Sequence, residues 1–298
     1  MTAMIAKECA VCGTAPFAVL YEARLPDVAN LDFSARRAPT RSHCRIVRCR
    51  ECGLVYSNPY FSPDEIQRLY REAGYIQEPQ LQNMARDYYA ELVKSLPSLS
   101  KDARILEVGC GNGFFLKLLH DQGYRNITGV EPGEEAVRDA PDDIRHLIRN
   151  EFFNPSRFEP ASFDLICCFQ VFDHVLDPNH VVGAFAGLLR PGGHVFAINH
   201  NIRSLSARLL GERSPMYDVE HVYLFDPRTI TLLFRKHGFD AVESHGISNA
   251  YELSYFLKML PLAAGVKQWL LRTLAAVSLD RLRFRLPGGN MATLAQRR

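Results

Sequence analysis

Apolar and polar positions along the chain change their period in a regular order after Lys101. Short apolar runs with strand character alternate with segments in which apolar residues recur every three or four positions, as in a buried helix face. This alternation implies right-handed crossovers and a parallel sheet. The expected strands are residues 104–108, 127–131, 144–148, 162–169, 194–198 and 240–244, and helices are expected after the first strand and at 178–189 and 227–237.

Gly109, Gly111 and Gly113 separate the first expected strand from the first helix. Glycine suits such a turn because a Cβ would forbid its backbone angles, and because a ligand must approach the bare backbone. The carboxylate of Glu107 repels phosphate and attracts an ammonium group, and the G-x-G-x-G spacing is shorter than the G-x-G-x-x-G of dinucleotide-binding folds. Glu131 ends the next strand, where a ribose acceptor is needed in either case. The pattern predicts a nucleoside ligand.

Residues 107–113 resemble the first motif, E/D-x-G-x-G-x-G, of the class I S-adenosylmethionine-dependent methyltransferases, and residues 163–193 carry a second similarity. The resemblance implies an α/β, Rossmann-like seven-stranded sheet whose last strand, residues 290–296, is antiparallel. It also implies cofactor contacts from the glycine loop, the second acid, the loops after later strands and two upstream tyrosines, for which plain packing is the alternative. These residues are Tyr70, Tyr75, Glu107, Gly109, Cys110, Gly111, Gly113, Glu131, Pro132, Glu151, Phe152, Phe169 and Gln170.

Two C-x-x-C-G knuckles lie near the N-terminus, with Cys9 and Cys12 in the first and Cys49 and Cys52 in the second. Four thiolates complete a closed tetrahedral zinc site, and an iron centre of rubredoxin type uses the same ligands. A redox dithiol is the other alternative, although a catalytic C-x-x-C usually stands at a strand-to-helix junction. We expect a structural zinc site in residues 1–60.

Two histidine-containing loops are expected at the carboxyl edge of the sheet, where open parallel sheets place their chemistry. His174 follows the fourth strand, and Glu220 and His221 lie beyond the fifth. An imidazole titrates near neutral pH and suits a general base, although a loop histidine that bonds backbone is the plain alternative. This set resembles the zinc-containing sugar C-methyltransferases, but Asp218 replaces their tyrosine and their large C-terminal domain is absent.

Three further segments complete the expected organisation: a helical linker or cofactor lid at 61–100, the methyltransferase domain at 101–298, and a helical insertion at 250–287. The insertion is apolar and then basic, at Arg281, Arg283 and Arg285. Contact with a membrane surface or acceptance of a lipid-linked substrate is one interpretation of such a segment. Capping of the domain or a dimer contact is the commoner role of such helices.

Composition narrows the remaining choices. The 298 residues are 47% hydrophobic and 23% charged, and the net charge of +2 gives no field that would attract nucleic acid. No secretory signal is visible in residues 1–10, and no run reaches the roughly 18 apolar residues of a membrane span. We therefore expect a cytoplasmic methyltransferase for a small-molecule acceptor such as a sugar. An NAD-binding oxidoreductase and a non-catalytic scaffold are the alternatives.

Overall fold

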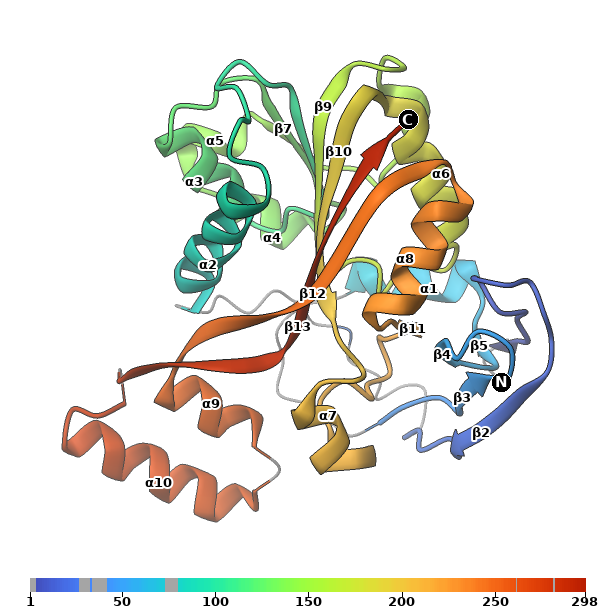
Figure 1. The fold of residues 1–298 in the computed structure, drawn as a ribbon. Coiled ribbons are helices and arrows are strands. Elements are labelled where there is room, and N and C mark those ends of the chain that lie inside the picture. Colours follow the sequence, from blue (N-terminus) through green and yellow to red (C-terminus); the bar gives the residue numbers. More distant parts are fainter. Residues whose placement is uncertain (1–3, 27–32, 34–41, 73–79, 261, 281) are drawn as a thin grey trace.

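The computed structural model describes residues 4–26, 33, 42–72, 80–260, 262–280 and 282–298, and its centre is a seven-stranded sheet (Figure 1). The strand order is β12-β13-β10-β9-β6-β7-β8, and only β13 runs antiparallel to its neighbours. This confirms the expected Rossmann-like α/β fold. The strands are β6 (Ile105–Val108), β7 (Ile127–Val130), β8 (Ile148–Arg149), β9 (Phe163–Phe169), β10 (Leu189–His200), β12 (Phe239–Glu252) and β13 (Arg283–Arg297).

Helices cover both faces of the sheet, which explains the unbroken apolar runs of its central strands. In β6, Leu106 and Val108 belong to the core under one helical layer, and Ile105 belongs to the core under the other. The two layers stand on opposite sides of the sheet in Figure 1. One contains α2 (Gln80–Ser95), α3 (Phe114–Asp121), α4 (Glu134–Arg138) and α5 (Asp142–Arg145), and the other contains α6 (Pro178–Leu188) and α8 (Pro227–Lys236).

Two of the expected elements differ from the structure. The strand expected at 144–148 is only Ile148–Arg149, because Pro141 and two acidic residues after it begin helix α5. Residues 190–193, between the expected helix at 178–189 and the expected strand at 194–198, are an irregular part of β10. Leu189 pairs with Phe163 and His194 with Leu165, so the intervening residues bulge out of register.

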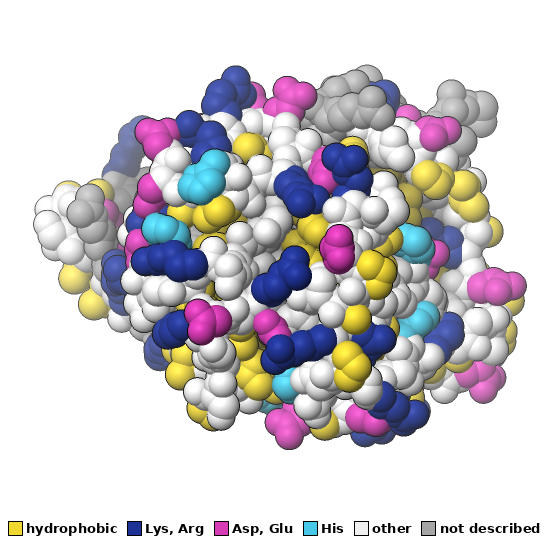
Figure 2. Space-filling view, turned by 90° about the horizontal axis from the view of Figure 1, so that it is seen from above, with side chains coloured by type: hydrophobic (Ala, Val, Ile, Leu, Met, Phe, Trp, Pro, Cys, Tyr) yellow, Lys and Arg dark blue, Asp and Glu magenta, His cyan; other side chains and the backbone are white. Residues whose placement is uncertain are grey.

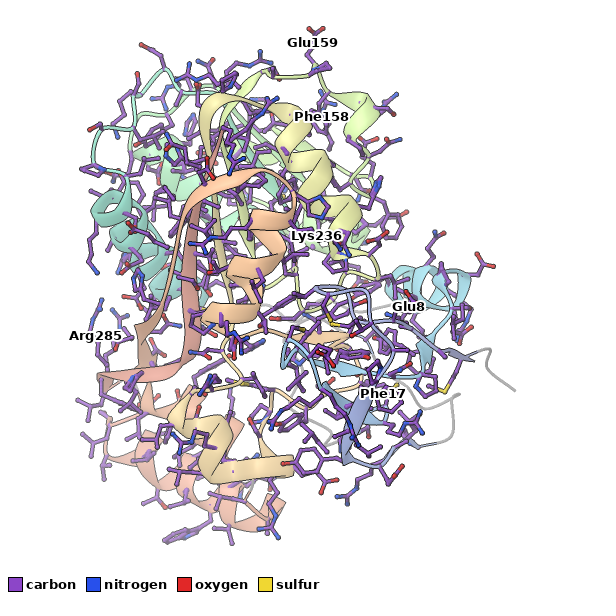
Figure 3. All side chains as sticks on the ribbon, turned by 45° about the vertical axis from the view of Figure 1, so that its right-hand side comes forward. Glu8, Phe17, Phe158, Glu159, Lys236 and Arg285 are labelled. Atoms are coloured by element: carbon purple, nitrogen blue, oxygen red, sulfur yellow. The ribbon has the colours of Figure 1, made fainter. Side chains whose placement is uncertain are left out.

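The N-terminal cysteine module is not separate from the rest of the chain. Its strands β2 (Phe17–Tyr21), β3 (Ile46–Cys49) and β4 (Val55–Ser57) form a sheet whose fourth strand, β11 (Tyr223–Leu224), comes from the later part of the sequence. A second small sheet pairs β1 (Met4–Ile5) with β5 (Tyr60–Phe61). Figure 3 shows Lys236, at the end of α8, on the side of this module, and its Nζ donates to the Ala10 carbonyl at 3.4 Å.

The expected helical insertion begins later and ends earlier than 250–287. Strands β12 and β13 continue past the main sheet as a two-stranded arm, in which Glu252 pairs with Arg283. Only α9 (Leu253–Met259) and α10 (Ala264–Ala276) at the tip of the arm are helical. In the described residues, no helix is long and apolar enough to span a membrane.

Helix α2 holds this arm in place. Its Asp87 accepts hydrogen bonds from the Ala250 backbone at 2.6 Å and from the Arg285 guanidinium at 2.5 Å. Arg283 lies 3.5 Å from Glu252. Two of the arginines expected to form an exposed basic cluster are therefore paired with carboxylates, and Arg281 lies outside the described residues.

Candidate active site

A cavity of about 1070 Å³ lies beyond the carboxyl ends of the parallel strands. The backbone that follows β6 and β7 forms one end, and the loops after β9 and β10 form the other. Helix α1 (Pro63–Glu72), α7 (Leu205–Leu210) and the arm complete the walls. This is the edge at which the sequence predicts the chemistry.

The glycine turn presents bare backbone to this cavity. Gly109 and Gly111 have φ of 74° and 56°, in the left-handed region that favours glycine. A Cβ on Gly111 would have nothing within 4 Å, because the residue faces open space. A ligand can therefore lie directly against the peptide at this position.

Glu131 stands at the same end of the cavity and is held by backbone donors. Its Oε2 accepts from the Gly111 amide at 2.9 Å and its Oε1 from the Gly133 amide at 2.8 Å. Burial raises the pKa of this carboxyl, while the two backbone hydrogen bonds act to lower it. Each carboxylate oxygen can accept a second hydrogen bond, so the pair of ribose hydroxyls of a nucleoside fits these acceptors.

Glu107 does not take the place that the sequence predicts. Strand alternation turns its side chain onto the sheet face covered by α3, beside Cys167, and it does not line the cavity. Neither carboxylate oxygen has a hydrogen-bond partner among the described residues. Burial raises the pKa of Glu107 well above its usual range, and the charge of Glu131 adds to this. A buried carboxyl that does not line the cavity has no direct contact with a ligand held there.

The other expected cofactor residues divide into two groups. Cys110 is buried and packs against Gly129, Gly113 begins α3 with Ile144 against it, and the Glu151 carboxylate lies 3.5 Å from Arg157. None of these three residues lines the cavity, and Tyr75 lies outside the described residues. The expected residues that do line it are Tyr70, Gly109, Gly111, Glu131, Pro132, Phe152, Phe169 and Gln170.

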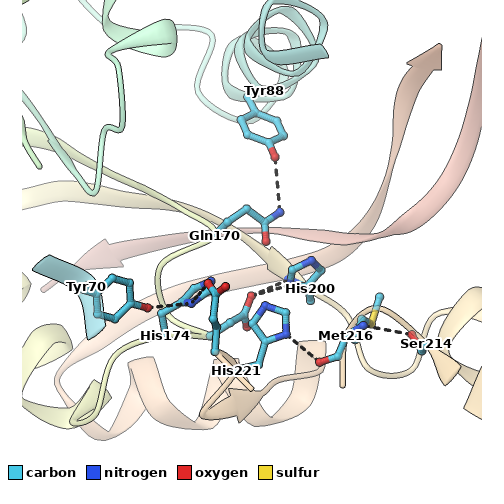
Figure 4. Close-up of polar contacts among 10 residues, drawn as sticks. Tyr70, Tyr88, Gln170, His174, His200, Ser214, Met216 and His221 are labelled. Carbon is cyan, nitrogen blue, oxygen red and sulfur yellow. Dashed lines mark hydrogen bonds and ion pairs between the residues drawn. The ribbon is translucent and has the colours of Figure 1, made fainter. Parts of the chain in front are cut away.

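Gln170 lines the cavity and lies between Tyr88 and the histidine cluster in Figure 4. Its φ of 55° is unusual for a residue with a side chain, and its amide nitrogen donates to the Ile198 carbonyl at 2.7 Å. Its side-chain nitrogen lies 3.5 Å from the Tyr88 hydroxyl, whereas its buried side-chain oxygen has no partner among the described residues. That oxygen suits a donor such as an ammonium group.

The expected histidines meet at the far end of the cavity. His174 and His221 have ring centroids 4.9 Å apart and both line the cavity, as does Glu220. The Nδ1 of His174 lies 3.1 Å from the Tyr70 hydroxyl and 3.8 Å from the Glu220 carboxylate. The fold thus brings together side chains from three separate segments of the chain (Figure 4).

His200 and Asp173 extend this cluster and were missed in the sequence. The ring of His200 lies 4.9 Å from that of His221, and its Nδ1 lies 2.9 Å from the fully buried Asp173 carboxylate. His200 is the last residue of β10, at the carboxyl edge of the sheet. The strand expected from the sequence ends at residue 198. The sequence therefore does not place His200 at the carboxyl edge of the sheet, where parallel sheets hold their functional residues.

Hydrogen bonding defines the tautomers of two of these rings. The Nδ1 of His221 lies 2.8 Å from the Met216 carbonyl, which only accepts, so Nδ1 carries the proton and Nε2 a lone pair. In its neutral form His200 likewise has a lone pair on Nε2, because its Nδ1 faces a carboxylate. Burial, with a contribution from the His200 charge, lowers the pKa of His221. For Asp173 burial acts to raise the pKa, but the hydrogen bond and charge of His200 lower it overall.

The four knuckle cysteines converge in the N-terminal module. The sulfurs of Cys9 and Cys52 are 3.4 Å apart, as are those of Cys12 and Cys49, and all four lie within 4.8 Å of one another. Tetrahedral Zn–S bonds of about 2.3 Å place sulfurs about 3.8 Å apart, so this donor set fits one zinc ion. Cys44 is buried outside the group.

Comparison with known proteins gives the same assignment as the fold. A family model described as a methyltransferase domain matches residues 80–244. A ubiquinone biosynthesis O-methyltransferase of Cupriavidus pinatubonensis is 29% identical over 171 residues, which cover 51% of this chain and 68% of that protein. A Yersinia pestis protein of the same name is 31% identical over 118 residues, which are 37% of this chain and 48% of the relative.

A solved structure, the YcgJ protein from Bacillus subtilis, superposes with a TM-score of 0.51 at 16% identity, covering 72% of this chain and 99% of that one. This likeness concerns the fold. The family match begins after the cysteine knuckles, so the similarity to zinc-containing sugar C-methyltransferases stays an expectation. The match over residues 80–244 shows that the chain belongs to the methyltransferase domain family and is a methyltransferase of the class that uses S-adenosylmethionine.

Proposed function

We propose that this enzyme methylates a small-molecule acceptor held at the histidine end of the cavity, with His221 as general base. The observation that carries the proposal is that one cavity contains both Glu131 with the glycine turn and the histidine cluster. S-Adenosylmethionine, when bound, supplies an electrophilic methyl group. Glu131 and the bare backbone at Gly111 would hold its nucleoside part, and Gln170 would accept from its ammonium group.

His221 suits the role of base for three reasons. Its burial disfavours the charged form, so the ring is neutral and able to accept a proton near pH 7. Its Nδ1 is fixed by the Met216 carbonyl, which leaves Nε2 to take the proton. The imidazolium that forms is stabilised by the nearby carboxylates of Asp173 and Asp218.

The other polar groups would position the acceptor. His174, Glu220 and the Tyr70 hydroxyl form one hydrogen-bonding set, and His174 is the second candidate base. The His200 ring, fixed by Asp173, presents a further acceptor nitrogen beside His221. The proton of the acceptor goes to a histidine while the new bond to the methyl carbon forms and the bond from that carbon to sulfur breaks.

We favour a hydroxyl oxygen as the attacking atom. The relatives that share about half of this chain are named O-methyltransferases, and an imidazole hydrogen-bonded to a hydroxyl removes its proton as attack proceeds. A sugar hydroxyl and a phenol both satisfy this requirement. The oxidoreductase alternative is disfavoured by the family, and a scaffold would be insensitive to loss of the histidines.

We propose further that the four cysteines hold a structural zinc ion, with iron as the alternative metal. The closed set of four sulfurs leaves no position for a substrate, which favours a structural role. The module is joined to the site through β11, because this strand begins two residues after His221. The metal would therefore stabilise the loop that carries the base.

The test is methyl transfer from labelled S-adenosylmethionine into a panel of hydroxylated acceptors. His221→Gln is expected to lower kcat by about 100-fold or more, the usual contribution of a general base, while S-adenosylhomocysteine affinity stays within a few fold. Asp173→Asn should lower kcat by a smaller factor and alter its pH profile. The matched control is His146→Gln, an exposed histidine away from the cavity. Undiminished turnover in both His221→Gln and His174→Gln would refute the histidine base.

A further inference from the structure

Two helices at one end of the molecule expose large apolar side chains. Leu205 and Leu209 of α7, four residues apart and thus on one side of the helix, are 61% and 76% exposed. On α10, Val266 and Trp269 are 50% and 63% exposed, and Val277, just after the end of this helix, is 57% exposed. Helix α7 and the α9–α10 hairpin both lie below the carboxyl edge of the sheet in Figures 1 and 3.

The exposed residues of α10 form a stripe. Val266, Trp269 and Thr273, spaced three and four residues apart, share one exposed side of the helix, whereas Lys267, Leu271 and Leu274 lie on a less exposed side. The hairpin is joined to the main sheet by the two-stranded arm. Nothing among the described residues covers the outward stripe.

The charge of this segment points to an anionic surface. Residues 253–279 contain Lys258, Lys267 and Arg272 and no acidic residue. Figure 2 shows the opposite end of the molecule, where lysines, arginines, aspartates and glutamates are interspersed. Like charges on two facing hairpins disfavour a second copy of this chain as the partner, whereas exposed tryptophan beside basic residues suits the interface of an anionic bilayer.

Helix α7 and helix α9 of the hairpin form walls of the cavity, whereas no described residue of α10 lines it. Leu205 and Leu209 of α7 and Tyr255, Phe256 and Leu260 on the hairpin side line it. The cavity therefore has an apolar part between the two exposed faces and a polar part at the histidine cluster. This arrangement matches an amphipathic ligand with a reactive polar head and an apolar chain.

We propose that α7 and the α9–α10 hairpin dock on an anionic lipid surface, and that the cavity between them receives an acceptor with a long apolar chain from that surface. The docking stands on the exposed faces and their charge. The identity of this chain-bearing molecule as the methyl acceptor rests on the proposed function. A peripheral contact of this kind needs no membrane-spanning helix.

Trp269 is the only tryptophan of the chain and lies on the proposed contact, so it reports on docking. The zinc-loaded full chain is mixed with vesicles of pure phosphatidylcholine and of phosphatidylcholine with equimolar phosphatidylglycerol. We expect flotation with the anionic vesicles, a blue shift of Trp269 emission, and quenching by brominated acyl chains. Leu209→Glu and Val266→Glu should each lower the bound fraction several-fold, and Arg272→Gln should weaken binding to the anionic vesicles.

Val93→Glu is the matched control, because Val93 is an apolar residue of α2 with 43% exposure outside the proposed contact. Binding of S-adenosylhomocysteine, measured on every variant, shows whether the cofactor site is intact and separates failure of docking from failure of the enzyme assignment. Absence of flotation for the wild type would overturn the proposal. So would a lipid-independent blue shift that grows with protein concentration, since this indicates a second copy on the stripe.

Discussion

The chemical states of the side chains around the cavity follow from their immediate partners. The Met216 carbonyl and the Asp173 carboxylate each accept a hydrogen bond from a histidine Nδ1, which leaves Nε2 of each neutral ring with an available lone pair. Glu131 remains an acceptor because two backbone amides point at it, whereas Glu107 has no donor among the described residues. Two acids near the same loop thus have different roles, because their surroundings differ.

Stability should fall on mild acidification because of His221. Its pKa in the folded chain lies below the ordinary value of 6.5, so the unfolded chain binds more protons as the pH drops through about 6.5. The free energy of unfolding therefore decreases below that pH. Urea unfolding of the wild type and of His221→Gln at pH 7.5 and 5.5 should show a smaller loss in the variant.

His146→Gln is the control for that comparison, because His146 is exposed. It should lose as much stability between the two pH values as the wild type does. An equal loss in His221→Gln would mean that burial of this imidazole does not produce the effect. Asp173, whose folded pKa is lowered below 3.8, should add a further loss only at much lower pH.

Sequence patterns located the elements well where local preference and burial agree. The central strands and α6 and α8 follow from apolar runs and from Pro178 and Pro227 at helix starts. The patterns did not predict structure that depends on pairing between distant segments. The arm of β12 and β13 exists because two distant segments pair, and the apolar residues around 251–286 gave no signal of it.

The site was predicted in the same unequal way. Gly111, Glu131, His174 and His221 follow edge and spacing rules, and all of them line the cavity. The orientation of Glu107 depends on which face of β6 it occupies, and the strand is too short for the alternation of its apolar residues to reveal that. The pairing of Asp173 with a histidine 27 residues later has no local signature.

The metal site gives a prediction for one element, the N-terminal module. Elemental analysis of the purified protein should find about one zinc per chain, and Cys49→Ser with Cys52→Ser should remove it. Cys44→Ala should retain the metal, because Cys44 lies outside the sulfur group. Equal metal content in the double variant would exclude this site.

The stability of the Cys49→Ser, Cys52→Ser variant tests how strongly the fold of the N-terminal module depends on the metal. Module and main domain share one hydrophobic core, which includes Tyr56, Phe61, Val222 and Phe225. We therefore expect the metal-free chain to stay folded but to unfold at lower urea concentration, rather than to lose the module altogether. The module is tied to the main domain because β11 completes its sheet.

At the scale of the whole molecule, three groups of residues meet at the carboxyl edge of the sheet. The glycine turn and Glu131 come from the first half of the fold, the histidines come from later loops, and the apolar helices α7 and α9 line the same cavity. The opposite end carries mixed charges (Figure 2). The sites proposed for the methyl donor, the base and the apolar chain of the acceptor therefore lie along one cavity.

The most direct test of this account is calorimetric titration of the wild type, Glu131→Gln and Glu134→Gln with S-adenosylhomocysteine. We predict one binding site per chain in the wild type and in Glu134→Gln, whose exposed side chain does not line the cavity. Glu131→Gln should lose about 1.5–3 kcal/mol, the usual value of a hydrogen bond to a charged group, or roughly 10- to 100-fold in affinity. Absence of binding to the wild type, or equal affinity in all three proteins, would contradict the assignment of this cavity to the methyl donor.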